Sequence, residues 1–164
     1  MKTLYLIGGP LGVGKTTVCR LLKKELDRAV FLDGDWCWDA DPFVVNDETK
    51  AMVLDNICHV LNNFLSCTAY ENVIFCWVMH EQGIIDAIQS ALRLQDCRVI
   101  NISLVCRRDV LVSRLEKDIC GGLRQPDVIG RSLDRLSCYA GLDTLKLDVS
   151  DQTPEQAARL IAAL

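Results

Sequence analysis

The N-terminal stretch reads TLYLIGGPLGVGKTT over residues 3–17, and it decides the fold. Its first part, Thr3–Ile7, is a short apolar run that predicts a buried strand. Glycines follow in the spacing GxxxxGK[ST] from Gly9 to Thr16, and apolar residues at helical spacing begin directly after them. A strand, a glycine-rich turn and a helix in this order predict a phosphate-binding loop.

The residues of this loop have separate roles in holding a phosphate chain. Glycines let the backbone curl around the phosphates, and the following helix directs the positive end of its dipole at them. Lys15 is expected to reach the β- and γ-phosphates, and the Thr16 hydroxyl to hold magnesium. The pattern therefore predicts binding of ATP and Mg²⁺. The expected nucleotide-binding residues are Gly9, Gly12, Val13, Gly14, Lys15, Thr16 and Thr17.

The rest of the chain alternates between apolar strands and amphipathic helices. Further strands are expected at 29–32, 73–79, 99–105 and 145–149. The last helix is expected to begin at Thr153-Pro154-Glu155-Gln156, a capping box with proline at the first helical position. This alternation favours an α/β fold with one parallel sheet and right-handed crossovers, in a single domain over residues 1–164.

Composition limits the class of protein. The 164 residues are 50% hydrophobic and carry a net charge of −4, which argues against binding nucleic acid or an anionic membrane by charge alone. Nine scattered cysteines contain no Cys-x-x-Cys pair, so we expect them to pack as small apolar side chains in a reducing compartment. No signal-peptide pattern or bilayer-length apolar run is visible, and a cytoplasmic location is expected.

A second motif, Asp33-Gly34-Asp35, directly follows the strand expected at 29–32. Ligands gather at the carboxyl ends of parallel strands, so Asp33 is expected near magnesium and the γ-phosphate. Asp35 is expected to orient or deprotonate an attacking hydroxyl. The alternative is an ordinary acidic turn that caps a strand. The strand expected at 73–79 has no terminal aspartate, so Asp33 is the remaining acidic partner for the metal.

A basic segment runs from Arg107 to Arg135, and two adjacent glycines interrupt it. Guanidinium groups stabilise the charge that spreads over a phosphoryl group during transfer, and glycines permit a lid to close. We expect a lid at about 118–127, with Arg124 as the first catalytic candidate and Arg114 as the second. The alternative is a solvated helical face, because acidic residues are interleaved with the basic ones.

Aromatic and histidine side chains follow two of the expected strands. Trp36 and Trp38 come directly after the acidic motif, and His80 follows the strand expected at 73–79. The tryptophans either stack on a flat substrate or pack under the loop, and we expect at least one in the substrate pocket. With Asp35, these three residues form the expected substrate-binding set, His80 as a polar contact.

Together the motifs resemble those of the small P-loop kinases, in particular the shikimate kinase, gluconate kinase and adenylylsulfate kinase group. The resemblance is carried by GGPLGVGKTT, FLDGD, SLVCRRDVLVSRL and LDVSDQTPEQAARLI. It implies a five-stranded parallel sheet in the order 2-3-1-4-5, an arginine-bearing lid, and transfer of the ATP γ-phosphate to a small-molecule hydroxyl. The chain lacks the glycine-rich acceptor motif of shikimate kinase, and Trp36 stands where gluconate kinase has a histidine.

The leading hypothesis is therefore an ATP-dependent kinase, a monomer or homodimer, that acts on a metabolite or a nucleoside-like acceptor. The acceptor is expected between Asp35, the tryptophans and His80, where a modest, partly apolar hydroxyl compound fits better than a polyanion. One alternative is a nucleotide-binding regulatory or interaction module with little turnover. Another is a nucleic-acid end kinase, which the acidic balance disfavours. No membrane partner is expected.

Overall fold

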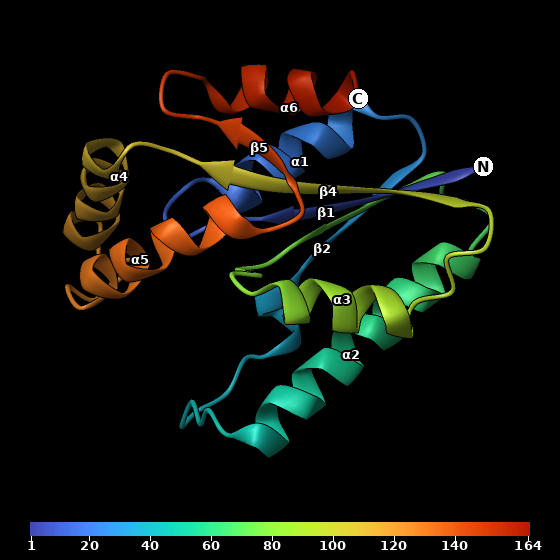
Figure 1. The fold of residues 1–164 in the computed structure, drawn as a ribbon, viewed down its shortest axis with the longest axis horizontal. Helices are drawn as coiled ribbons and strands as arrows, with labels where there is room; N and C mark the ends of the chain where they lie inside the picture. The colour runs from blue at the N-terminus through green and yellow to red at the C-terminus, as the bar shows by residue number, and fades with distance from the viewer.

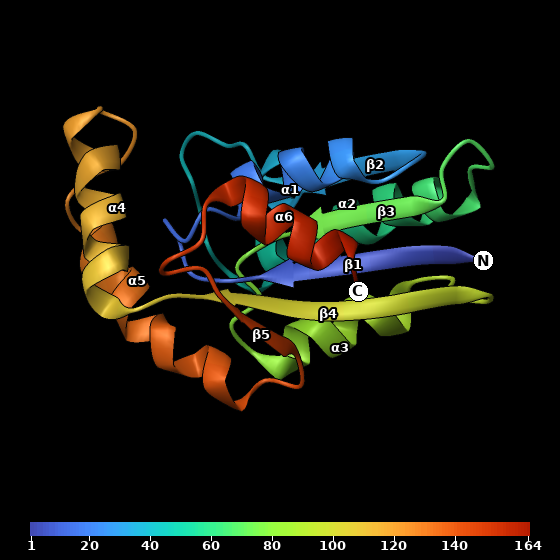
Figure 2. The ribbon, with the colours of Figure 1, turned by 90° about the horizontal axis from the view of Figure 1, so that it is seen from above.

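The computed structural model describes all 164 residues and contains one five-stranded parallel sheet. Its strands are β1 (Lys2–Gly8), β2 (Ala29–Asp33), β3 (Asn72–Cys76), β4 (Cys97–Val105) and β5 (Leu145–Asp148). They lie in the order β2-β3-β1-β4-β5, and each neighbouring pair is parallel (Figure 2). The expected fold class and strand order are confirmed.

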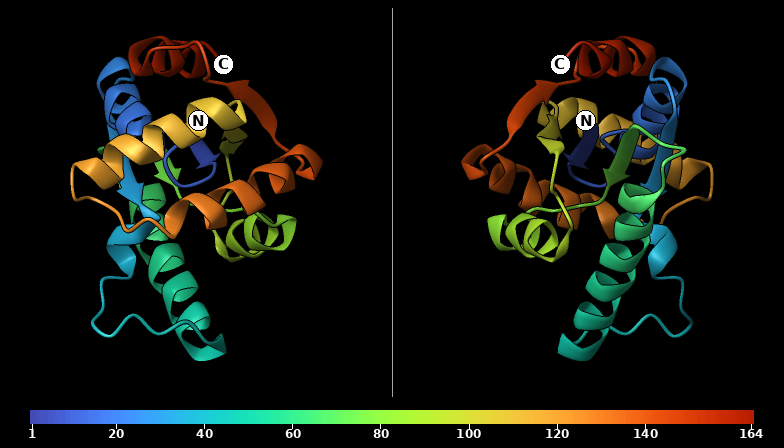
Figure 3. Two further views of the ribbon diagram at one scale, coloured as in Figure 1. Left: turned by 90° about the vertical axis from the view of Figure 1, so that its left-hand side faces the viewer. Right: turned by 90° about the vertical axis from the view of Figure 1, so that its right-hand side faces the viewer.

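Helices cover both faces of this sheet (Figure 1). One face carries α1 (Lys15–Glu25) and α6 (Pro154–Ala162), and the other carries α2 (Asp47–Ser66) and α3 (Gln82–Ala91). Helices α4 (Arg108–Cys120) and α5 (Val128–Leu136) lie beyond the carboxyl ends of the strands, nearest the viewer on the left of Figure 3. Two 3₁₀ turns, η1 (Gly34–Cys37) and η2 (Ser137–Gly141), complete the structure. None of the helices combines the length and apolarity needed to cross a membrane.

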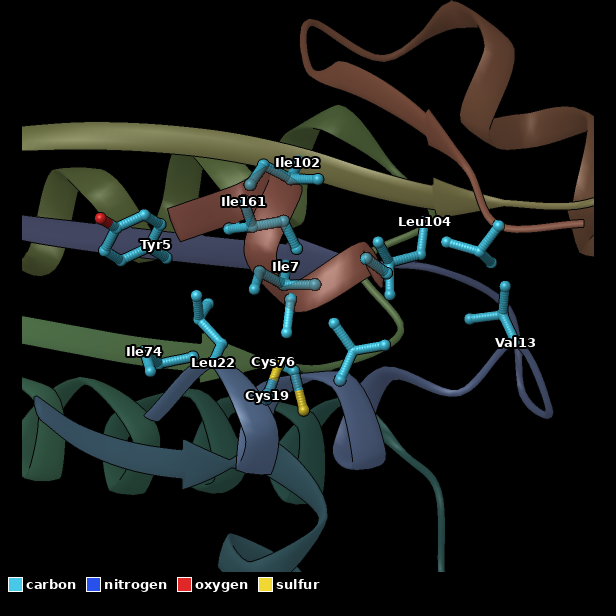
Figure 4. Packing of buried hydrophobic residues seen from close by; sticks show 14 of the residues in the cluster. Tyr5, Ile7, Val13, Cys19, Leu22, Ile74, Cys76, Ile102, Leu104 and Ile161 are labelled. Atoms are coloured by element: carbon cyan, nitrogen blue, oxygen red, sulfur yellow. The ribbon is translucent and has the colours of Figure 1, made fainter. Parts of the chain in front are cut away.

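The central strand β1 is buried on both faces because its alternate side chains enter two different cores. Tyr5 and Ile7 pack into the cluster beneath α1 and α6, where Ile161 of α6 meets them (Figure 4). Leu4 and Leu6 point the other way and pack into the cluster beneath α2 and α3. A run of apolar residues without polar alternation is typical of such a doubly covered parallel strand.

The cysteines contribute to these cores as free thiols. All nine are unpaired, and four of them are buried. Cys19 of α1 and Cys76 of β3 lie next to each other in the core beneath the phosphate loop (Figure 4). These two residues therefore fill space between the first helix and the sheet.

Two boundaries differ from the sequence-based expectation by three residues, and the others by one or two. Strand β3 ends at Cys76 rather than at Met79, because Met79 takes a φ of 39° that no strand accommodates. Residues 77–81 therefore form a loop at the carboxyl edge of the sheet. Helix α4 continues to Cys120, and the Gly121 N–H bonds to Lys117, so the irregular part of the expected lid begins at residue 121.

Candidate active site

The phosphate loop ends in an uncapped helix N-terminus. Helix α1 begins after Gly14, whose φ of 103° lies in the left-handed region that favours glycine. No side chain caps this helix, and its first turn carries no acidic residue. Helices α2 and α6, by contrast, both have complete capping boxes. The first N–H groups of α1 are therefore available to an anion such as a phosphate.

Lys15 lies within the loop and is held by its backbone. Its Nζ donates to the carbonyl oxygens of Gly9 (2.8 Å) and Pro10 (2.9 Å). Removal from bulk water lowers the pKa of Lys15, and the nearby carboxylates of Asp35 and Asp33 oppose that effect. No carboxylate pairs directly with this ammonium group. Its charge is therefore left for a ligand in the loop.

Thr16 and Asp33 bring together two side-chain oxygens of the kind that magnesium prefers as ligands. The Thr16 hydroxyl donates to Asp33 Oδ2 at 2.6 Å, and Asp33 Oδ1 accepts the Asp35 backbone N–H at 3.1 Å. Asp33 is 5% exposed and has no basic partner, so its donor set suits a hard cation. The chain has no cluster of three or more His, Cys, Asp or Glu side chains able to hold a metal. Magnesium would therefore take its other ligands from phosphate and water.

A cavity of about 410 Å³, the loop cavity, lies over this site. Its floor is formed by the loop, including Gly12, Val13, Gly14, Lys15, Thr16 and Thr17. Gly9 lies outside the lining and contributes its carbonyl oxygen to Lys15. Lys117 of the expected basic segment also lines the cavity, as does the segment 152–154, which sequence reasoning did not place in the site. That segment follows β5, so the rule that ligands gather at carboxyl strand ends could have found it.

The two candidate arginines both line the loop cavity, but in different ways. Arg114 donates to the carbonyl oxygens of Val13 (3.0 Å) and Val149 (2.8 Å), so it ties the loop to the segment after β5. Arg124 pairs with Asp118 at 3.0 Å and is only one-third exposed. Arg124 therefore has a carboxylate partner and no bond to the loop, whereas Arg114 holds the loop backbone.

A second cavity of about 710 Å³ adjoins the first. Nine of its fifteen lining residues are hydrophobic, among them Trp38, Phe43 and Ile84. Four residues line both cavities, namely Leu11, Asp35, Trp77 and Val78. The second cavity is therefore separated from the loop cavity by a boundary that carries one acidic side chain.

Asp35 is that boundary group. Burial raises the pKa of its carboxyl, and the neighbouring Asp33 raises it further. Lys15, the Trp77 side chain and Arg124 each lower this pKa by a smaller amount. A carboxyl whose pKa is raised in this way binds a proton more readily than an exposed aspartate does.

The structure separates the two tryptophans of the expected substrate set. Trp38 lines the second cavity and stacks on Phe43 with ring centroids 4.6 Å apart. Trp36 lines neither cavity, is 54% exposed, and packs edge-on against Phe31 at 5.2 Å. That at least one tryptophan lies in the substrate pocket stays a prediction, and Trp38 is the one beside the second cavity, because the 3₁₀ turn η1 directs side chains two residues apart to different sides. Trp77, which sequence reasoning missed as the first residue beyond β3, takes the place at the boundary.

His80 lies in the second cavity with the expected polar character. Its Nε2 is 3.2 Å from Glu81 Oε1, while its Nδ1 is buried without any hydrogen-bond partner. Burial lowers the pKa of His80, the charge of Arg135 lowers it further, and Glu81 opposes both. A neutral imidazole that donates from Nε2 leaves Nδ1 as an acceptor.

Two arginines of the expected basic segment line the second cavity. Arg131 and Arg135, both on α5, border this cavity and not the loop cavity. The basic side chains of the segment therefore divide between the two cavities, with Arg114, Lys117 and Arg124 at the loop cavity.

Comparison with known proteins places this site in a family. A family model described as an AAA domain matches residues 6–121, which hold the phosphate loop and the acidic motif. The chain belongs to this AAA domain family. The search of curated proteins found no match to this chain.

Solved structures share the whole fold of this AAA domain protein. The tunicamycin resistance protein of Deinococcus radiodurans is 24% identical with a TM-score of 0.75, and the alignment covers 99% of this chain and 95% of that one. A gluconokinase of Sinorhizobium meliloti is 17% identical with a TM-score of 0.72 over 98% and 90% of the chains. Shikimate kinase of Acinetobacter baumannii is 22% identical with a TM-score of 0.64 over 98% and 90%. These likenesses confirm the resemblance to the small P-loop kinases in fold.

Proposed function

We propose that this protein is an ATP-dependent kinase that transfers the γ-phosphate to a hydroxyl group of a small molecule. The proposal rests on one observation: Asp35 lines both the loop cavity and the second cavity. A nucleophile in the second cavity and a phosphate chain in the loop cavity would meet at this carboxylate. The P-loop kinase fold implies nucleotide binding, and the gluconokinase and shikimate kinase among its structural neighbours support a small-molecule acceptor.

On the nucleotide side, ATP would lie along the loop with its phosphates on the N-terminus of α1. Lys15 would exchange its bonds to the Gly9 and Pro10 carbonyls for phosphate oxygens. Thr16 and Asp33 would hold magnesium, which supplies positive charge at the phosphate oxygens when it is bound. Arg124, one-third exposed on the lid, would supply further charge at the transferred group.

On the acceptor side, the hydroxyl group would enter the second cavity and approach Asp35. Its oxygen forms a bond to the γ-phosphorus, its proton passes to the Asp35 carboxylate, and the bond to the β–γ bridging oxygen breaks to release ADP. The raised pKa of Asp35 makes its carboxylate a better proton acceptor than an exposed aspartate. Trp77 at the same boundary would exclude water from this point.

A metabolite screen tests the proposal. The protein is incubated with Mg-ATP and individual hydroxyl compounds, ADP release is followed, and mass spectrometry identifies any phosphorylated product. Lys15→Ala, purified in parallel, controls for contaminating kinases. We expect the parent protein to phosphorylate at least one compound, and we expect the Lys15→Ala preparation to phosphorylate none. Normal ATP binding with no acceptor-dependent ADP release across the panel would instead favour a nucleotide-binding module with little turnover.

A further inference from the structure

The second cavity carries positive charge in a protein whose net charge is −4. Lys50 of α2 and two arginines of α5, Arg131 and Arg135, line it. Arg131 pairs with Asp127 at 3.1 Å, but the guanidinium group of the half-buried Arg135 forms no ion pair or hydrogen bond within the chain. This guanidinium group is therefore available to an anionic ligand, and a charge-assisted hydrogen bond there is stronger than one between neutral groups.

A second unsatisfied group faces the same cavity. The buried Nδ1 of His80 has no partner, and Arg135 is near enough for its charge to act on this imidazole. Two acidic groups line the cavity. Asp35 lies at the boundary with the loop cavity, and the Glu81 carboxylate is 3.2 Å from His80 Nε2. Neither contacts Arg135 within ion-pair distance. The Arg135 guanidinium is therefore left to bind an anion, while Nδ1 of the neutral imidazole can accept a hydrogen bond from a donor such as a ligand hydroxyl group.

The remaining wall of the cavity is apolar and aromatic. Trp38 and Phe43 stack on each other, and Ile84 and Leu54 extend the same surface. Phe43 is 59% exposed and Val45 is 57% exposed, although both line the cavity. Cavities of this volume, about 710 Å³, with a few placed polar groups are typical of sites for ligands larger than a compact polyol.

We propose that the molecule bound in the second cavity is an amphiphilic hydroxyl acid. It carries one anionic group, a carboxylate or a phosphate ester, which Arg135 binds beside His80, and an apolar ring or chain that lies on Trp38 and Phe43. As a statement about the acceptor this rests on the proposed kinase function, but the anion site itself does not. A fully polyanionic ligand does not suit a cavity whose lining is mostly apolar.

Binding without ATP tests this proposal independently of phosphoryl transfer. The probes are hydroxyphenylpropionate, its neutral methyl ester, hydroxyphenethyl phosphate and glycerate, a compact acid without an apolar body. Quenching of tryptophan fluorescence reports binding, since Trp38 and Trp77 line the cavity. We expect an aromatic acid to bind about tenfold more tightly than the ester, the effect of one charge-assisted contact. The carboxylate and phosphate probes identify which anion is preferred.

Variants assign the preference to Arg135. Arg135→Gln should abolish the difference between acid and ester, and Arg135→Lys should restore part of it. Arg159→Gln is the matched control, because Arg159 lies on α6 outside both cavities and is 71% exposed on its side chain. Equal binding of acid and ester to the parent, or an acid preference that survives in Arg135→Gln, overturns the proposal. So does tighter binding of glycerate than of both aromatic acids, or no binding of any acidic probe.

His80 provides a readout that needs no variant. A bound anion offsets the charge of Arg135, so the acid should raise the pKa of His80 relative to the ester complex, as measured by NMR titration. Glu81, the other charged neighbour of His80, is the same in both complexes, so only the effect of Arg135 changes in that comparison. An unchanged His80 pKa would place the acid elsewhere. Binding of acids without transfer to any of them would reject the kinase and retain the anion site.

Discussion

The hydroxyl group of Thr16 donates a 2.6 Å hydrogen bond to Asp33, and this contact joins the first turn of α1 to the last residue of β2. The Asp35 backbone N–H donates to the other oxygen of the same carboxylate. Both carboxylate oxygens of Asp33 therefore accept hydrogen bonds, whereas the Asp35 side chain lies at the boundary between the cavities. This division predicts different consequences when each acid is replaced.

Replacing Asp33 and Asp35 by asparagine should separate metal support from proton transfer. Asp33→Asn should chiefly raise the magnesium concentration needed for turnover. Asp35→Asn should chiefly lower the rate of transfer to the acceptor, by about a hundredfold or more, with little change in ATP affinity. Steady-state kinetics at varied magnesium and acceptor concentrations distinguish the two. Near-normal kinetics in both variants would indicate that Asp33-Gly34-Asp35 is only a structural turn that caps strand β2.

Lys15→Ala should weaken ATP binding or abolish turnover. The substitution removes the one ammonium group that the loop backbone positions over the phosphate site, while the buried core beneath it stays intact. Calorimetric titration with Mg-ATP measures the affinity, and the unfolding temperature confirms that the variant is folded. Lys23→Ala, on the last turn of the same helix and outside both cavities, is the matched control. Parent-like ATP binding by Lys15→Ala would disprove the assignment of the loop.

The pH dependence of transfer should carry the signature of Asp35. A general base must be deprotonated, so kcat/KM should rise with pH through the pKa of Asp35 and then level off. Burial and Asp33 both raise that pKa, so the midpoint should lie above the ordinary aspartate value of about 4. In Asp33→Asn the neighbouring charge is lost, and the midpoint of the residual activity should move to lower pH. A midpoint that does not move would exclude Asp35 as the titrating group.

The segment from Gly121 to Asp127 should become protected when ligands bind. It lies between α4 and α5 without regular structure, and Leu123 within it is 77% exposed. We expect amide hydrogen exchange here to slow when both ATP and an acceptor are present, because Arg124 then contacts the phosphates. The capped start of α6 at Thr153 serves as a reference within the same data. Equal exchange with and without ligands would argue against a lid.

Trp38→Ala should impair use of the acceptor far more than Trp36→Ala. Trp38 lines the second cavity, whereas the ring of Trp36 packs on Phe31 outside it. Loss of the Trp38 ring should raise the acceptor KM or lower kcat/KM by about tenfold, with ATP affinity unchanged. Trp36→Ala is the matched control. Comparable effects of the two substitutions would remove the second cavity as the acceptor site.

Local patterns were sufficient to predict the sheet and the phosphate loop. The loop spacing and the unbroken apolar run of β1 depend on residues close together in the chain, and the parallel α/β fold that they predict is confirmed. The strand order, which the resemblance to small P-loop kinases implied, is confirmed as well. The direction in which α5 faces depends instead on distant contacts. Ser132 donates to the Leu11 carbonyl at 2.7 Å, and Tyr139 donates to the Val78 carbonyl at 2.6 Å. These bonds span 121 and 61 residues, and no periodicity reveals them.

The same limit explains why sequence reasoning did not distinguish the two cavities. Arg131 and Arg135 flank Ser132 on α5, so their orientation follows from a bond that only the folded chain contains. Trp36 and Trp38 differ in position because of the phase of one 3₁₀ turn. Charge and composition identified these residues as candidates, but tertiary contacts decide which cavity each one enters.

Only four residues border both cavities, and this sharing has a consequence for how such a protein diversifies. The walls that belong to the second cavity alone come from residues 38–54, α3 and α5, and they contain no part of the phosphate loop. Substitutions there can exchange one substrate for another while the machinery for nucleotide use is inherited intact. A library randomised at Trp38, Phe43, Ile84 and Arg135 is therefore the natural starting point for redirecting this scaffold to new chemistry.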